Sequence, residues 1–159
     1  MALRNQKCEM KMLSLHNQKN YSMKNFFFNS GNHKPLSSIA ILILRASFGL
    51  LLLTHGWPKL MNLTQGSSSF PDPFHVGNKT SLALVVFAEF ICSILIVLGL
   101  GTRFAAFSIM IAMFVASFII NGGHPVADRE LSILYLSAFT AILIFGAGSY
   151  SLDKAISGK

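Results

Sequence analysis

The sequence is poor in charged residues, and above all in acidic ones. Only 12% of its 159 residues are charged, and six of them are Asp or Glu, whereas soluble domains average about 25% charged residues. Hydrophobic residues make up 52% of the chain. This composition excludes an ordinary soluble domain and indicates a membrane protein in contact with the lipid bilayer.

Cysteine is scarce as well. Cys8 lies in the polar start of the chain and Cys92 lies within an apolar run, so there is no CxxC pair. This spacing argues against a thiol-exchange enzyme that acts through its own dithiol, and Cys92 is interpreted as a small apolar filler. The chain has no flavin or dinucleotide fingerprint, and His55 with His124 is a weak basis for a metal site. We expect no metal and no intrinsic cofactor.

The net charge of +7 does not indicate a nucleic-acid partner, because of where the charge lies. A basic flank before a membrane segment is expected from the positive-inside rule. Six basic residues precede the first apolar run, namely Arg4, Lys7, Lys11, Lys19, Lys24 and Lys34.

Four apolar runs predict transmembrane helices, since each approaches the ~20 residues that span a bilayer. The predicted fold is an all-α, membrane-embedded four-helix bundle. With the N-terminus inside, nine Lys or Arg residues flank the inner side and three the outer side. This asymmetry predicts that both termini are cytoplasmic. The helices are expected at about 36–56, 80–100, 103–121 and 130–147.

Two polar segments flank the predicted bundle, which covers residues 36–153. Residues 1–35 are basic and lack periodicity, so we expect a disordered tail. Met23 offers an alternative start within that tail, and residues 154–159 form a short C-terminal tail.

Two ionisable residues lie deep in the apolar runs. Arg45 is about nine residues into the first predicted helix and Glu89 is about nine residues into the second, which places both near the mid-plane. We predict that they form an ion pair. The pair fixes how the two helices dock, belongs to a functional polar site, or does both, since a site needs fixed geometry too; intramembrane charges are by default suspected of function. His55, at the outer end of the first helix, either joins that site or is an interfacial hydrogen-bonding residue.

The apolar chain resembles the DoxX family of small four-helix membrane proteins. The resemblance rests on LILRASFGLLLLTHGWPKLM, the lone Glu89, LGLGTRFAA and GAGSYSLD, and it covers Leu36 to Asp153. By position, the recurring polar residues of the family correspond to Arg45, His55, Lys59, Glu89, Thr102, Arg103 and Asp153. Structural roles are also expected for Gly56, in the same motif, and for Glu130, whose acid suits the first turn of a helix. The chain departs from the pattern at Asn121, where a His is common, and at His124, where an acid is common.

The resemblance implies an integral protein of the bacterial inner membrane that is associated with a redox system. Quinone is the implied ligand, a redox partner protein would supply or take the electrons, and Glu89, Arg45 and His55 are the candidate catalytic residues. One alternative is a non-catalytic scaffold or assembly protein. A solute or proton transporter is less favoured, because four short helices would need a homo-oligomer and no broken helix pair marks a substrate site. Whether the chain is an enzyme stays open.

Overall fold

A computed structural model describes residues 35–66 and 70–157. The expected tail, including the alternative start at Met23, lies outside the described residues. Throughout the described part the secondary structure is helical, which confirms the all-α expectation. The elements are α2 (Pro35–Thr64), α3 (Asn78–Val86), η1 (Phe87–Ile91), α4 (Cys92–Leu98), α5 (Thr102–Phe114), η2 (Val115–Ile120), α6 (Val126–Phe145) and α7 (Leu152–Ser157).

The first helix is longer than the apolar run predicted. α2 starts at Pro35, a residue favoured in the first helical turn, and runs to Thr64 instead of ending near residue 56. Pro58 lies inside it, since membrane helices tolerate the missing N–H of a proline. Lys59 is therefore a helical residue and not part of an outer loop.

Two of the long helices contain a π-helical segment. α3, η1 and α4 form one continuous helix, Asn78–Leu98, and α5 continues through η2 as Thr102–Ile120. Gly99 ends the first of them in the left-handed conformation. π-Helical turns are rare and occur frequently at functional sites, which draws attention to η1 and η2.

The last long helix starts earlier than predicted. α6 begins at Val126, directly after Pro125, so Asp128 is in its first turn and Glu130 is not. The prediction placed the start at residue 130 because it took the charged residues as the limit of an apolar run. The helix instead extends into the polar segment, and Pro125 is the actual start signal.

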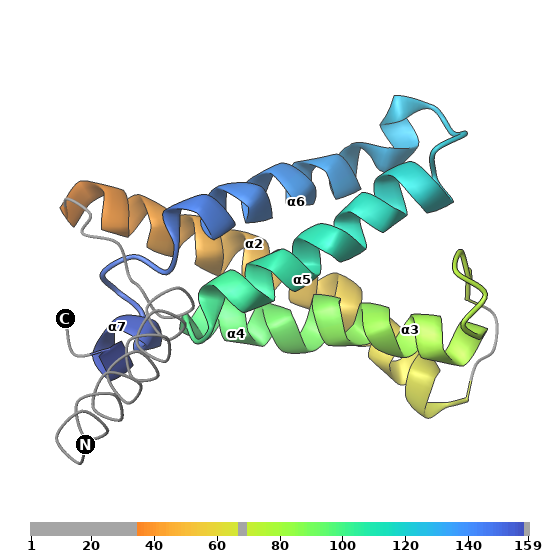
Figure 1. Cartoon of the computed structure of the whole chain (residues 1–159), viewed down its shortest axis with the longest axis horizontal. Coiled ribbons are helices and arrows are strands. Elements are labelled where there is room, and N and C mark those ends of the chain that lie inside the picture. The colour runs from red at the N-terminus through yellow and green to blue at the C-terminus, as the bar shows by residue number, and fades with distance from the viewer. Residues whose placement is uncertain (1–34, 67–69, 158–159) are drawn as a thin grey trace, which may run out of the picture.

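The helices pack as neighbours in chain order (Figure 1). α2 lies along the continuous helix formed by α3, η1 and α4, and α5 packs against both α4 and α6. α4 and α5 meet at a short turn and diverge toward their other ends. The buried core consists of Leu52, Cys92, Ile96, Ala105, Ala106, Ile109, Met113, Tyr135, Phe139 and Ile142.

Long apolar helices with exposed apolar side chains identify an integral membrane protein. Within the described residues, three helices are long and apolar enough to cross a membrane: Pro35–Thr64, Asn78–Leu98 and Thr102–Ile120. Large hydrophobic side chains are exposed on every long helix, including Leu50, Ile91, Phe107 and Ile144. Soluble monomers rarely expose apolar surface so widely, so lipid must cover these faces.

Candidate functional site

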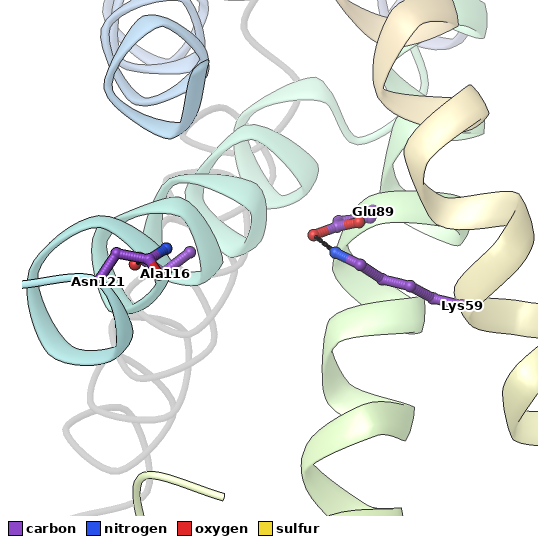
Figure 2. A network of polar contacts seen from close by, with 4 residues as sticks. All are labelled: Lys59, Glu89, Ala116 and Asn121. Carbon is purple, nitrogen blue, oxygen red and sulfur yellow. Dashed lines mark hydrogen bonds and ion pairs between the residues drawn. The ribbon is translucent and has the colours of Figure 1, made fainter. Parts of the chain in front are cut away.

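The buried acid in the bundle is paired with a lysine. Lys59 of α2 donates a hydrogen bond to Oε1 of Glu89 in η1 and forms an ion pair with it. The Glu89 side chain is 6% exposed and that of Lys59 is 32% exposed. Figure 2 shows the ammonium reaching the carboxylate on the side of η1 that faces η2. The predicted Arg45–Glu89 pair is therefore wrong, because Lys59 takes the place expected for Arg45.

Gly56 allows α2 and η1 to approach closely enough for this pair. A Cβ atom on Gly56 would lie 2.9 Å from both the carbonyl carbon and the carbonyl oxygen of Glu89. Lys59 follows one helical turn later, so its stem leaves α2 beside the Glu89 side chain. The close approach at Gly56 thus sets the position of the ion pair.

Arg45 belongs to a second polar cluster at the other end of the helix pair. It is 1% exposed, and it donates to the carbonyl oxygens of Ala147 and Tyr150, the latter at 3.0 Å. A Cβ atom on Gly99 would lie 2.8 Å from its guanidinium nitrogen Nη1. Gly99 is ten residues from Glu89 along the helix, or about 15 Å. Arg45 therefore lies level with the turn that ends α4, and not at the depth of Glu89.

Asp153 ties the chain end into this second cluster. Its carboxylate accepts hydrogen bonds from the backbone N–H groups of Gly101 (2.7 Å) and Thr102 (3.0 Å), where α5 begins. An anion is stabilised at a helix N-terminus, and the Asp153 charge also acts on Arg45. Thr102 is buried, and Arg103 follows it on α5. The LGLGTR and GAGSYSLD segments thus meet around Arg45.

A cavity of about 450 Å³ opens beside the ion pair. Its lining residues come from α3 and η1, from α5 and η2, and from the loop that precedes α3. The wall is apolar apart from Lys59, Glu89 and two serines. The lining residues are Lys59, Phe70, Pro71, Pro73, Phe74, Ser81, Leu84, Val85, Phe87, Ala88, Glu89, Ser108, Ile111, Ala112, Val115, Ala116 and Ile120.

The loop over the cavity is fixed by Asp72. Its carboxylate accepts hydrogen bonds from the backbone N–H groups of Val76 (3.2 Å) and Gly77 (2.6 Å) and from the Ser81 hydroxyl (2.7 Å). The hydrogen bond from Ser81 is the largest of the effects that lower the pKa of Asp72. Asp72 therefore holds its neighbours Pro71 and Pro73 in the cavity wall.

The two positions at which the chain departs from the DoxX pattern lie outside the cavity wall. The Asn121 side chain donates to the carbonyl of Ala116 at 2.9 Å, and the Asn121 backbone N–H bonds the same oxygen at 3.1 Å, which ends η2 (Figure 2). His124 lies 4.0 Å from Asp128 in an exposed pair. Asn121 thus supports a wall of the cavity through η2, and His124 belongs to the surface turn.

His55 packs against a buried tyrosine and has no bond to Glu89 among the contacts of the described residues. It is exposed, and its ring packs edge-on against Tyr135 of α6 with centroids 6.0 Å apart. Tyr135 is 3% exposed. The sequence analysis did not single out Tyr135. The signal that could have identified it is its position as the single tyrosine within the fourth apolar run.

Other candidate residues lie apart from the cavity. Glu130 is exposed on α6, and Cys92 is fully buried in the core. Across residues 35–66 and 70–157, His, Cys, Asp and Glu form no group of three or more that could hold a metal ion. The chemistry of the site is that of one buried carboxylate, one ammonium group and an apolar wall.

Comparisons with known proteins agree with the motif pattern. The family model for DoxX matches residues 40–122, just over half of the chain. An uncharacterized protein of Haemophilus influenzae (strain Rd) is 31% identical over 130 residues, covering 75% of this chain and 92% of its own length. No solved structure matches. The chain belongs to the DoxX family of membrane proteins.

Proposed function

We propose that this protein is a four-helix subunit of the bacterial inner membrane that binds quinone beside Glu89 as part of a redox system. The observation that carries the proposal is the apolar cavity of about 450 Å³ with the Lys59–Glu89 pair in its wall. Ligand sites are typically apolar hollows of about 300–1,000 Å³ with a few polar groups that orient the ligand. A substituted quinone ring matches that combination of size and polarity.

The arrangement of the described chain ends supports a four-helix topology with both termini on the cytoplasmic side. Ser38, near the start of α2, bonds Ser149 at 2.9 Å, and Gly148 packs on Ile41, so the two ends of the bundle chain lie together. A chain that crosses the membrane an even number of times has both of its ends on the same side of the membrane. α6 has 20 residues and provides the fourth crossing, and the excess of basic residues in both tails favours the cytoplasmic side.

The proposed role of this subunit is to handle protons, with electron transfer left to a partner. Oxidation of a quinol to a quinone releases two protons and two electrons. The sequence offers no cysteine pair and no flavin fingerprint, so a partner protein or its cofactor takes the electrons. In this proposal Glu89 accepts a proton from the quinol, Lys59 pairs with the Glu89 carboxylate, and the exposed His55 packs against Tyr135 of α6.

A scaffold function is the second candidate, and the Arg45 cluster is the observation that favours it. Arg45 and Asp153 are both 1% exposed and are hydrogen-bonded to backbone groups of other segments, as expected of groups that fix a shape. In a scaffold the Lys59–Glu89 pair would serve the same purpose. The two functions differ in whether a ligand occupies the cavity.

The deciding experiment is mass spectrometry of the protein extracted in mild detergent. Wild type, Glu89→Gln and the exposed-acid control Glu130→Gln are compared for co-purifying quinone. The proposal expects a stoichiometric quinone, in its oxidised or reduced form, in wild type and in the control, and loss of the reduced form in folded Glu89→Gln. A quinone-free wild-type protein that co-purifies with a partner protein instead would establish the scaffold function.

A further inference from the structure

One oxygen of the buried carboxylate has its hydrogen-bonding capacity unused. Oε1 of Glu89 accepts from Lys59, whereas Oε2 is buried and has no hydrogen-bond partner among the described residues. Glu89 as a whole is 4% exposed, and it lines the cavity. A buried acceptor left without a donor is costly, and more so when it is charged.

The other polar side chains of the wall do not supply the missing donor. The Ser81 hydroxyl donates to Asp72 at 2.7 Å, and the Ser108 hydroxyl donates to the carbonyl of Phe104 at 3.1 Å. Lys59 is bonded to Oε1, and its side chain is 32% exposed. Among the described residues that line the cavity, the Glu89 Oε2 acceptor is therefore the buried side-chain atom left without a partner, whereas Lys59, Ser81 and Ser108 each have one.

The apolar wall restricts the body of the ligand. Aromatic side chains of the loop and of η1 line it together with small residues of α5 and η2, among them Phe74, Phe87, Ala112 and Ala116. Three lining residues, Leu84, Phe87 and Ile111, are 60%, 41% and 47% exposed. The cavity is therefore open rather than enclosed, which leaves room for an apolar tail to extend out of it.

We infer that the cavity selects an apolar molecule that carries a hydroxyl group, which donates to Oε2 of Glu89. This inference rests on the proposed function and sharpens it: the preferred form is the reduced quinol, whose hydroxyls are donors, and not the quinone, whose carbonyls only accept. The same contact places the hydroxyl proton next to the carboxylate that would receive it. The cavity should therefore bind a ligand of equal shape more weakly when that ligand lacks the O–H group.

The test uses a matched ligand pair on the full chain in lipid nanodiscs. Binding of 4-heptylphenol and of its methyl ether, 4-heptylanisole, is measured by isothermal titration calorimetry. We expect wild type to prefer the phenol by about tenfold or more, the usual worth of a hydrogen bond to a charged group. In Glu89→Gln the preference falls below about threefold, and in the control Glu130→Gln it stays as in wild type. Ala112→Leu, which fills the cavity, weakens both ligands equally.

The wild-type comparison alone keeps the inference testable if a variant fails to fold. Equal affinity of wild type for the phenol and its ether overturns the inference, even if quinone co-purifies and the proposed function holds. Preference for the phenol that survives in folded Glu89→Gln also overturns it. A clear Glu89-dependent preference for the phenol, with no affinity for a short-chain quinol, would keep the selection of a hydroxyl group by Glu89 and would reject both the quinol as its ligand and the quinone-linked function.

Discussion

Gly56 packs its backbone directly against the carbonyl of Glu89. A Cβ atom at Gly56 would lie 2.9 Å from that carbonyl group and 3.1 Å from the nitrogen of Phe90. These are backbone atoms, so the clash can be relieved only if α2 moves away from η1. The Lys59–Glu89 pair depends on that distance, because both residues sit at the same helix contact.

The first prediction follows for Gly56→Ala. Overpacking costs about 1–3 kcal/mol, and the better helix propensity of alanine returns at most ~1 kcal/mol. We expect a lower thermal midpoint in detergent, read by labelling of the buried Cys92 thiol in a Cys8→Ser background. Gly123→Ala is the matched control, since nothing lies within 4 Å of its added Cβ. Equal midpoints for the two variants would contradict the close approach.

The second prediction concerns which basic residue is coupled to Glu89. In a double-mutant cycle, Lys59→Met and Glu89→Gln should show an interaction free energy of about 0.5–3 kcal/mol, as expected of contacting residues. The cycle of Arg45→Lys with Glu89→Gln should be additive within ~0.5 kcal/mol, because those residues share no contact. The unfolding free energies come from denaturant titration of the same Cys92 signal. Strong coupling between Arg45 and Glu89 would argue for the pairing that the sequence suggested.

The third prediction tests the anchor at the other end of the bundle. Asp153→Asn replaces a buried, 1% exposed carboxylate that accepts two backbone N–H groups at the start of α5. An amide oxygen retains part of this bonding, so we expect a loss of about 1–3 kcal/mol in unfolding free energy. Asp128→Asn, at an exposed acid in the first turn of α6, should change it by less than ~0.5 kcal/mol. Similar losses in both variants would show that Asp153 has no special structural role.

The sequence predicted the all-helical membrane fold because apolar runs report directly on membrane helices. It failed at the ion pair for a physical reason. The depth of each charged residue in the membrane is predicted from its distance to the edge of its apolar run. In the structure α2 extends past Pro58 to Thr64 and so brings Lys59 alongside η1. Pro58 is read from the sequence as a helix end, because proline normally ends a helix. The structure shows that α2 continues past it to Thr64.

The cavity could not be predicted from the sequence at all. Its lining residues come from α3 and η1, from α5 and η2, and from the loop that precedes α3, and single-sequence periodicity carries no signal for a π-helical turn. Glu89 and Lys59 were both singled out as polar motif residues, but Tyr135 and the loop contact of Asp72 to Ser81 emerge only when distant segments are placed together. The sequence shows which polar residues are present, but it does not show which residues lie next to them in the folded chain.

The last prediction uses the loop that covers the cavity. The hydrogen bonds from Ser81, Gly77 and Val76 stabilise the ionised form of Asp72, so its pKa in the folded protein lies below the ordinary value of 3.8. A group with a lowered folded pKa contributes stability above its unfolded pKa, and this contribution is lost as the pH falls through the folded pKa. The loop should therefore stay anchored from neutral pH down to about pH 4 and loosen only in stronger acid.

NMR titration of selectively labelled aspartate carboxyls in detergent micelles measures this directly. Wild-type Asp72 should titrate below the ordinary value, and Ser81→Ala should raise its pKa because the leading hydrogen bond is gone. Ser157→Ala, which removes a serine hydroxyl bonded within α7, is the control and should leave Asp72 unchanged. Since Asp72 holds Pro71 and Pro73 in the cavity wall, Ser81→Ala should also speed ligand release. A wild-type pKa at or above the ordinary value would mean that Asp72 does not anchor the loop and that the cavity is open on that side.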